Sequence, residues 1–298
     1  MVASGSYHCF ENLSMKCILA LAALLIAVSS LAQAADCSPE ADEVNAKCYP
    51  GNLQAAVDAA LTTDRPLVMP RGTYPISKTL VIDYSAHRGT GFELIARGAI
   101  IDGTGIQNTP AVEITCASDC FYFHQEGTLF VNANTTTYAL VMGKPDFSDA
   151  HNSIKLDHLI VNNGNTGPNA GGVQLNYVLN ADMFVVADVA GAGNGLALEQ
   201  VQFSTIRGAA SATNGAALAI ENGYSFADTF TSLDLEVSKT CWLITSIKAS
   251  HMGDIAPYTN CPTIVTTTHA AWNVWTTTSA EISGMTGGDM VTALKWLD

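Results

Sequence analysis

Gly172-Val173-Gln174-Leu175-Asn176 is the first of four similar phrases that decide the fold of this chain. The other three are Gly195-Leu196-Ala197-Leu198-Glu199, Ala217-Leu218-Ala219-Ile220-Glu221 and Cys241-Trp242-Leu243-Ile244-Thr245. Each alternates apolar residues with small or polar ones, which is typical of a short strand. When Leu175, Leu198, Ile220 and Ile244 are aligned as one column, the steps are 23, 22 and 24 residues. A period of this size indicates a solenoid.

A second strand-like run lies in each interval of this repeat, at 183–189, 203–206 and 233–237. Two or three strands per repeat without a helical period predict a right-handed parallel β-helix, whose coils stack at about 4.8 Å. A leucine-rich repeat is excluded, since its Leu-x-x-Leu-x-Leu-x-x-Asn phrase and helical return limb are missing. A β-sandwich also has short strands at turn-punctuated intervals and is the alternative.

The first part of the sequence has the pattern of a secretory signal peptide. Met15-Lys16, an apolar run at 17–28 and Ala32-Gln33-Ala34 supply the charged start, apolar middle and cleavage site. We therefore expect a signal peptide at 1–34, with 1–14 as a possible upstream extension, and a single β-helix domain at 35–298. The product is expected in the periplasm or outside the cell, free of the membrane after cleavage.

Six of the eight cysteines lie after the expected cleavage site. In an oxidising compartment an even number indicates disulfides, although six cysteines allow 15 pairings. Proximity in sequence favours Cys37 with Cys48, Cys116 with Cys120, and Cys241 with Cys261. Cys116 and Cys120 have no second pair at zinc spacing, so no metal or other cofactor is expected.

The charge balance limits the possible partners. The chain has 13 Lys and Arg against 27 Asp and Glu, a net charge of -14. Nucleic acid is excluded as a partner, because neutralising phosphates requires clustered basic residues. The same balance weakens the case for any polyanionic partner. The sequence leaves the oligomeric state open.

The N-terminal part of the expected domain has a helical pattern followed by a turn. Asn52 can cap a helix with apolar residues at 53, 56, 57, 60 and 61, and this helix would cover the open end of the solenoid. Together with the following phrase, Val68-Met69-Pro70-Arg71-Gly72-Thr73-Tyr74-Pro75-Ile76, it resembles the opening of the pectate-lyase-like superfamily. The resemblance implies a parallel β-helix. It leaves function open, because that superfamily includes lyases, hydrolases, epimerases and phage tailspikes.

Catalytic phrases of particular branches of that superfamily do not occur in this chain. The polygalacturonase branch would bring paired Asp phrases, Gly-His-Gly and Arg-x-Lys, and none is present. Pectate lyases would bring acidic calcium ligands and a catalytic Arg with basic neighbours, where this chain offers Arg207 and Lys155. The resemblance therefore implies fold only.

The outward positions of the repeated strands supply candidate catalytic residues. Aligning the phrases predicts a column of Thr115, Val141, Asn176, Glu199, Glu221 and Thr245, beside a row of Gln174, Ala197 and Ala219. Glu199 and Glu221 would face solvent one coil apart, close enough for the two carboxylates of a glycosidase. Their mutual repulsion would raise one pKa and give an acid beside a base. A solvated acidic ladder is the alternative interpretation.

Other candidates are assigned to the same groove. Asp188 and Arg207 end neighbouring strands and could pair or flank the groove, where Arg207 could neutralise a substrate carboxylate. Possible substrate-binding residues around the glutamates are Asn176, Tyr177, Asn222 and Tyr224.

The resulting hypothesis is a secreted or periplasmic protein that binds and cleaves an extracellular polysaccharide, most simply by hydrolysis. Two alternatives are a lyase or epimerase acting on a uronic-acid polymer through Arg207, and a non-catalytic β-helix that holds a glycan or serves as structure.

Overall fold

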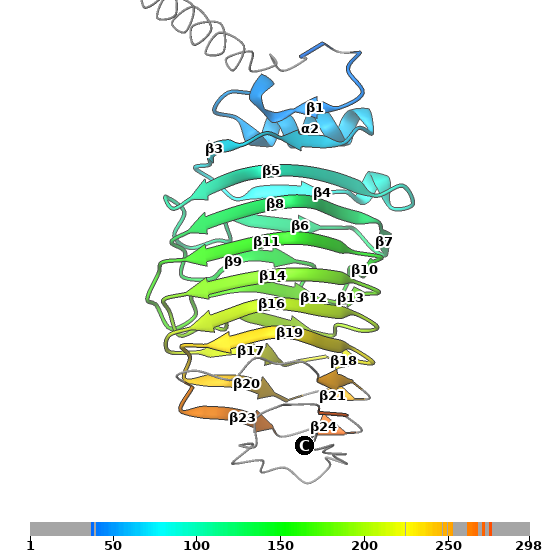
Figure 1. Cartoon of the computed structure of the whole chain (residues 1–298). Coiled ribbons are helices and arrows are strands. Elements are labelled where there is room, and N and C mark those ends of the chain that lie inside the picture. Colours follow the sequence, from blue (N-terminus) through cyan, green and yellow to red (C-terminus); the bar gives the residue numbers. More distant parts are fainter. Residues whose placement is uncertain are drawn as a thin grey trace, which may run out of the picture. The chain divides into compact units, whose positions relative to one another are not determined.

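The structure is a computed structural model, and it describes residues 37–38, 40–223, 225–245, 247–248, 250–252, 261–267, 270–271 and 274–275. The expected signal peptide at 1–34 and the candidate Tyr224 lie outside the described residues. All described residues belong to one compact unit. The expected parallel β-helix is confirmed, because consecutive coils pair in parallel throughout (Figure 1).

Three sheets run along the stack, here called A, B and C in the order in which each coil visits them. Sheet A contains β1 (Val44–Asn45), β2 (Leu67–Met69), β3 (Gly72–Pro75), β5 (Phe92–Gly103), β8 (Phe123–Ala133), β11 (Lys155–Asn163), β14 (Asp182–Val189), β16 (Thr205–Ala212), β19 (Thr229–Glu236), β22 (His251–Met252) and β25 (Val274–Trp275). Sheet B contains β4 (Leu80–Asp83), β6 (Val112–Thr115), β9 (Tyr138–Met142), β12 (Gly171–Asn176), β15 (Leu196–Glu199), β17 (Ala216–Ile220), β20 (Thr240–Ile244) and β23 (Thr263–Thr267). Sheet C contains β7 (Cys120–Phe121), β10 (His151–Asn152), β13 (Val178–Leu179), β18 (Ser225–Phe226), β21 (Ile247–Lys248) and β24 (Ala270–Ala271), and Gln202 bridges its two halves.

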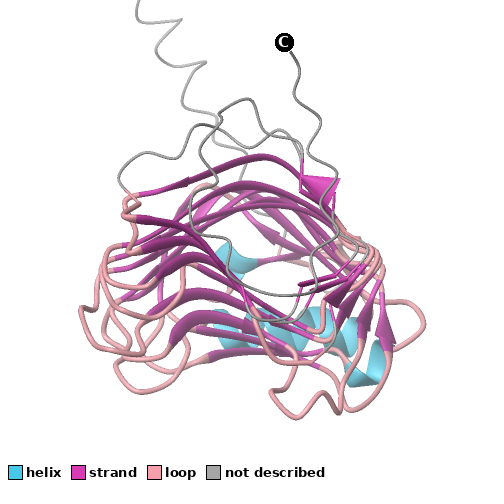
Figure 2. Cartoon of the chain, turned by 90° about the horizontal axis from the view of Figure 1, so that it is seen from below, coloured by secondary structure: helices cyan, strands magenta, loops and turns pink. Residues whose placement is uncertain are grey.

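The register of sheet B follows the column seen in the sequence. Leu175 pairs with Leu198, Leu198 with Ile220, and Ile220 with Ile244. All four side chains are fully buried, so the column forms one wall of the core. Viewed along the stack, the strands enclose this interior (Figure 2). One of the strands expected between these repeats is displaced: the sequence predicted it at 203–206, whereas β16 begins at Thr205 and ends at Ala212.

The N-terminal end of the stack is covered by helix α2 (Leu53–Thr63), as predicted. Asn52 caps it by accepting a hydrogen bond from the Ala55 N–H at 3.1 Å. Its buried residues, Leu53, Ala56, Val57 and Ala60, join the core, and the helix packs against β1, β2 and β4. A short 3-10 helix precedes it at Ala46–Cys48, and another follows β4 at Ser85–His87.

The three disulfides have the predicted pairing: Cys37 with Cys48, Cys116 with Cys120, and Cys241 with Cys261. Their Cα atoms are 5.6, 6.2 and 5.7 Å apart, within the range that a disulfide requires. Within the described part of the chain, no helix is long and apolar enough to cross a membrane.

Two corners of the coil turn on a single residue in the left-handed conformation. The B–C corner has Tyr177, Gln200 and Asn222 at φ of 51°, 58° and 49°. The C–A corner has Tyr122, Ser153, Asn180, Phe203 and Ala227 at φ between 51° and 64°. This conformation reverses the alternation of side chains, so neighbouring residues at a corner can both point outward.

A ladder of side-chain oxygens ties the coils together where sheet A begins. The Ala181 N–H donates to Ser204 Oγ, the Ser204 N–H to Asp228 Oδ1, and the Asp228 N–H to Ser250 Oγ, at 3.1, 3.0 and 3.0 Å. Asp228 is 1% exposed, and its Oδ2 has no partner among the described residues. Burial raises the pKa of Asp228 to about 8, although the Ser204 N–H bond lowers it.

We expect Asp228 to make stability fall with rising pH. Its carboxyl remains protonated in the folded state, whereas in the unfolded chain it ionises near its ordinary pKa of 3.8. The free energy of unfolding should therefore decline between about pH 4 and pH 8, by up to about 1.4 kcal/mol per pH unit. Asp228→Asn, which copies the protonated acid, should remove this decline in urea titrations across the range.

Asp188→Asn is the matched control, because Asp188 is exposed on β14. It should retain the decline of the wild type. Parallel pH curves for the wild type and Asp228→Asn would show that Asp228 is not the titrating group.

Candidate functional site

The two candidate glutamates lie on adjacent coils at the C-terminal edge of sheet B. Glu199 ends β15, and Glu221 directly follows β17 and donates its backbone N–H to the Leu198 carbonyl at 3.1 Å. Ala197 and Ala219 are buried yet lie outside the core cluster, so they form the floor of the outer face. The expected adjacency of the glutamates on a floor of alanines is thus present.

Glu199 is more enclosed than the sequence indicated. It is only 9% exposed, and its Oε1 accepts a hydrogen bond from Gln174 Nε2 at 2.8 Å. Asn222 also donates to this carboxylate. Burial raises the pKa of Glu199, the bonds from Gln174 and Asn222 lower it, and the charge of Glu221 raises it. The net shift is upward, because the loss of solvation on burial disfavours the charged form.

Glu221 lies in a more open and polar environment. It is half-buried, and its Oε2 accepts a hydrogen bond from Asn194 Nδ2 at 3.1 Å. The same Asn194 amide donates to the Tyr138 hydroxyl at 3.1 Å. Burial raises the pKa of Tyr138 to about 12, with further contributions from the charges of Glu221 and Glu199. Tyr138 therefore stays protonated as a hydrogen-bond donor beside the two carboxylates.

This cluster combines an enclosed carboxyl with a more accessible carboxylate. Two carboxyl groups in unequal environments are the arrangement from which an acid and a base can be drawn. Asn194 and Tyr138 were not identified from the sequence, because Tyr138 starts β9 and Asn194 lies two residues before β15, whereas the glutamates lie at the C-terminal ends of their strands. Side chains reaching across the strand bring them together.

The aligned column was wrong at two positions. Val141 pairs with Gln174 and Glu113, so it belongs to the neighbouring row. Gly143 occupies its place in the column, and its carbonyl accepts a hydrogen bond from Asn176 Nδ2 at 3.0 Å. Asn176 is fully buried because it turns into this corner, so the expectation that its side chain faces solvent was wrong.

Asp188 and Arg207 lie on sheet A, away from the glutamate strands of sheet B. Arg207 pairs with Asp182 at 2.5 Å, and Asp188 accepts a hydrogen bond from Ser211 Oγ at 2.7 Å. The predicted pairing of Asp188 with Arg207 is therefore wrong: Arg207 lies opposite Phe184, near the start of β14, while Asp188 lies near its end.

Two of the remaining candidates adjoin Glu199 at the B–C corner. Asn222 is exposed and contacts the Glu199 carboxylate, while half-buried Tyr177 donates its N–H to the Glu199 carbonyl at 2.9 Å. No group of three His, Cys, Asp or Glu residues in the described ranges is placed to hold a metal ion.

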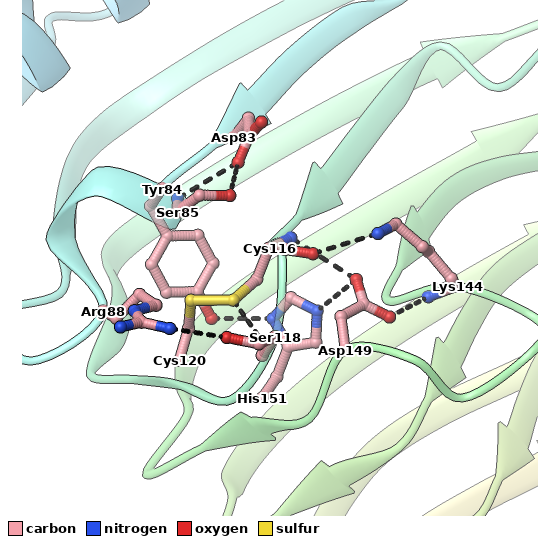
Figure 3. The surroundings of a disulfide bond; sticks show 10 residues. All are labelled: Asp83, Tyr84, Ser85, Arg88, Cys116, Ser118, Cys120, Lys144, Asp149 and His151. Atoms are coloured by element: carbon pink, nitrogen blue, oxygen red, sulfur yellow. Dashed lines mark hydrogen bonds and ion pairs between the residues drawn. A yellow bond between two sulfur atoms is a disulfide. The ribbon is translucent and has the colours of Figure 1, made fainter.

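A loop between β9 and β10 forms a wall beside this corner. Phe147 reaches Gly223, where its ring would lie 3.1 Å from an added Cβ. The base of the loop is fixed by buried Asp149, which accepts the Lys144 N–H at 2.6 Å and the Cys116 N–H at 3.3 Å. Figure 3 shows His151 between Asp149 and Tyr84, beside the Cys116–Cys120 disulfide.

The direction of the hydrogen bonds in this buried chain is determined by its ends. The Asp149 carboxylate can only accept, so His151 Nε2 carries a proton and donates at 3.2 Å. His151 Nδ1 then accepts from the Tyr84 hydroxyl at 2.7 Å. Burial raises the pKa of Tyr84, and the charge of Asp149 adds to the shift, so this hydroxyl remains a donor.

Neither a family model nor a curated protein matches the sequence. Among solved structures, the A-module of the Azotobacter vinelandii mannuronan C-5 epimerase AlgE4 is similar at 12% identity and a TM-score of 0.42, over 81% of this chain and 71% of that one. The Agl-KA catalytic domain is similar at 11% identity and a TM-score of 0.34, over 86% of this chain and 58% of that one. Likeness at this level of identity concerns the fold alone.

We predict that Gln174→Met raises the pKa of Glu199 further. The substitution removes a hydrogen bond that favours the charged form and leaves the burial. Carboxyl ¹³C NMR titration of Glu199 measures the shift. Val141→Met, in the same row one coil away, is the control and should leave the titration unchanged. An unaltered midpoint in Gln174→Met would refute the assigned contact.

Proposed function

We propose that this protein is a secreted or periplasmic glycoside hydrolase that acts on an extracellular polysaccharide. Glu199 serves as the general acid and Glu221 as the base or nucleophile. The observation that carries the proposal is the unequal environment of two glutamates on adjacent coils. Glycoside hydrolysis requires such a pair, with one carboxyl protonated beside the leaving oxygen and the other ionised.

The neighbouring groups fit these roles. Gln174 and Asn222 orient the carboxyl of Glu199, and Asn194 donates a hydrogen bond to that of Glu221. Three disulfides support an oxidising compartment, where extracellular polysaccharides are met. The acidic balance of the chain favours a substrate without dense negative charge.

A uronate lyase or epimerase reaction through Arg207 is less well supported. Its guanidinium is engaged by Asp182 on the surface of sheet A, away from the glutamate strands. A non-catalytic glycan-binding role is the remaining alternative, and it differs from hydrolysis by the absence of product.

The test is an assay of residues 35–298 against neutral and uronic-acid polysaccharides, following reducing ends and ultraviolet absorbance together. Hydrolysis produces reducing ends alone, whereas elimination adds the absorbance of an unsaturated uronide. Glu199→Gln and Glu221→Gln should each lower kcat by about 10²–10⁴-fold, the usual contribution of a general acid or base. In the wild type, activity should fall at high pH as Glu199, whose pKa burial raises, loses its proton.

Glu113→Gln is the matched control, since Glu113 is a half-buried glutamate on β6 of the same sheet. It should retain wild-type activity. Full activity in both catalytic variants would exclude this mechanism. A rise in ultraviolet absorbance with every substrate that yields reducing ends would show that the reaction is elimination and not hydrolysis.

A further inference from the structure

The C–A corner carries aromatic side chains that the fold does not require. Tyr122 and Phe203 are 47% and 54% exposed, although both occupy left-handed positions at φ of 64° and 55°. Ser153, Asn180 and Ala227 take the same position on other coils, so the turn does not need a ring. Bulky residues are uncommon in this conformation, and such outliers gather at functional sites.

The two rings belong to one straight strip along the stack. Sheet C pairs Phe121 with Asn152, Asn152 with Leu179, and Leu179 with Gln202. The residues that follow these at the corner therefore stack too, which places Tyr122 three coils from Phe203, or about 14 Å along the stack. We call Tyr122, Asn152, Ser153, Asn180 and Phe203 the corner strip.

The backbone holds this strip rigidly. Tyr122, Ser153, Asn180 and Phe203 each donate a backbone N–H to a carbonyl of the next coil, at 2.9 to 3.0 Å. Phe203 also packs edge-on against Phe226, with ring centroids 5.5 Å apart. A ligand that spans the strip would therefore meet fixed rings, with little ordering to do on binding.

Amide groups fill the interval between the rings. Asn180 Nδ2 donates to Asn152 Oδ1 at 2.9 Å, and Ser153 Oγ donates to the same oxygen at 3.2 Å. Asn152 Nδ2 and Asn180 Oδ1 have no hydrogen-bond partner among the described residues, so both remain for a ligand or water. None of the five strip residues carries a charge.

The strip also leads into a cavity at its N-terminal end. Tyr122 lines a cavity of about 450 Å³ together with His124, Phe92, Glu93, Asp64 and Arg65. The cavity thus combines aromatic and hydrogen-bonding groups beside the first ring. Its lining contains Arg65, His87 and His124 as well as two carboxylates, and the net charge of -14 of the chain disfavours a polyanion.

We propose that the corner strip binds a linear neutral oligosaccharide, with one end in this cavity. Rings stack on the apolar faces of sugars, and amides between them exchange hydrogen bonds with hydroxyl groups. An extended chain matches a straight, rigid strip with rings at both ends. The strip lies at the C–A corner, whereas the glutamates lie at the B–C end of sheet B, so the proposed site does not use the glutamate pair.

The experiment measures binding in the Glu199→Gln background, which prevents turnover and keeps this test separate from that of hydrolysis. An array of neutral linear oligosaccharides of several linkages, with oligouronates for comparison, is followed by calorimetry on the neutral hexasaccharide bound best. Tyr122→Asn and Phe203→Asn should each weaken its binding at least about tenfold. Disaccharides should bind much more weakly, because they cannot span both rings.

Asn suits a left-handed position, so these variants should keep the melting temperature of the parent, and circular dichroism checks this. Val237→Asn is the matched control. Val237 is 46% exposed at φ of 48°, but it follows the C-terminal end of β19, whereas the corner strip lies where the strands of sheet A begin. It should leave binding unchanged.

Three results would overturn the proposal. These are failure of every neutral oligosaccharide to bind, binding that the folded Tyr122→Asn variant leaves unchanged, and a dimer in sedimentation that both aromatic substitutions dissociate. The last would identify the strip as a contact between copies of this chain.

Discussion

Every coil of this protein must return the chain to the position of the coil before it. Parallel strands pair only when that return is accurate, because a shift of one residue would move each inward side chain to the outer face. After β12, β15 and β17, single left-handed residues at two corners provide the return, whereas after β9 a loop forms the B–C corner. They bend the chain sharply and let Leu175, Leu198, Ile220 and Ile244 form one column, although the coils differ in length by one or two residues.

Because the coils stack in register, the side chains of neighbouring rows give two glutamates different surroundings. Glu199 and Glu221 occupy equivalent positions, but the row beside them changes from Gln174 to Ala197. Glu199 therefore accepts a hydrogen bond from the Gln174 amide on the preceding coil. At the equivalent place beside Glu221 lies the methyl group of Ala197, and Glu221 accepts a hydrogen bond from Asn194 instead. One change in a neighbouring row thus separates an enclosed carboxyl from an accessible one.

Much of the fold followed from the sequence because its signals are local or periodic. The leucine column, the cap at Asn52 and the three disulfide pairs needed only spacing and proximity. The placement of Val141 failed because the interval between β9 and β12 is longer than the repeat, so counting from Asn176 missed Gly143. Asn194, Tyr138 and the Tyr84–His151–Asp149 chain were beyond reach, since their contacts join residues with no shared period.

The left-handed corners also determine where each residue lies on the surface of the stack. The coil on which a residue lies fixes its position along the axis of the stack. The number of residues between it and the corner fixes its position around that axis. Two chemical groups placed on chosen coils are therefore separated by a whole number of steps of about 4.8 Å. The distance between two surface groups can therefore be changed in steps of one coil, by moving one of the residues to the equivalent position on another coil.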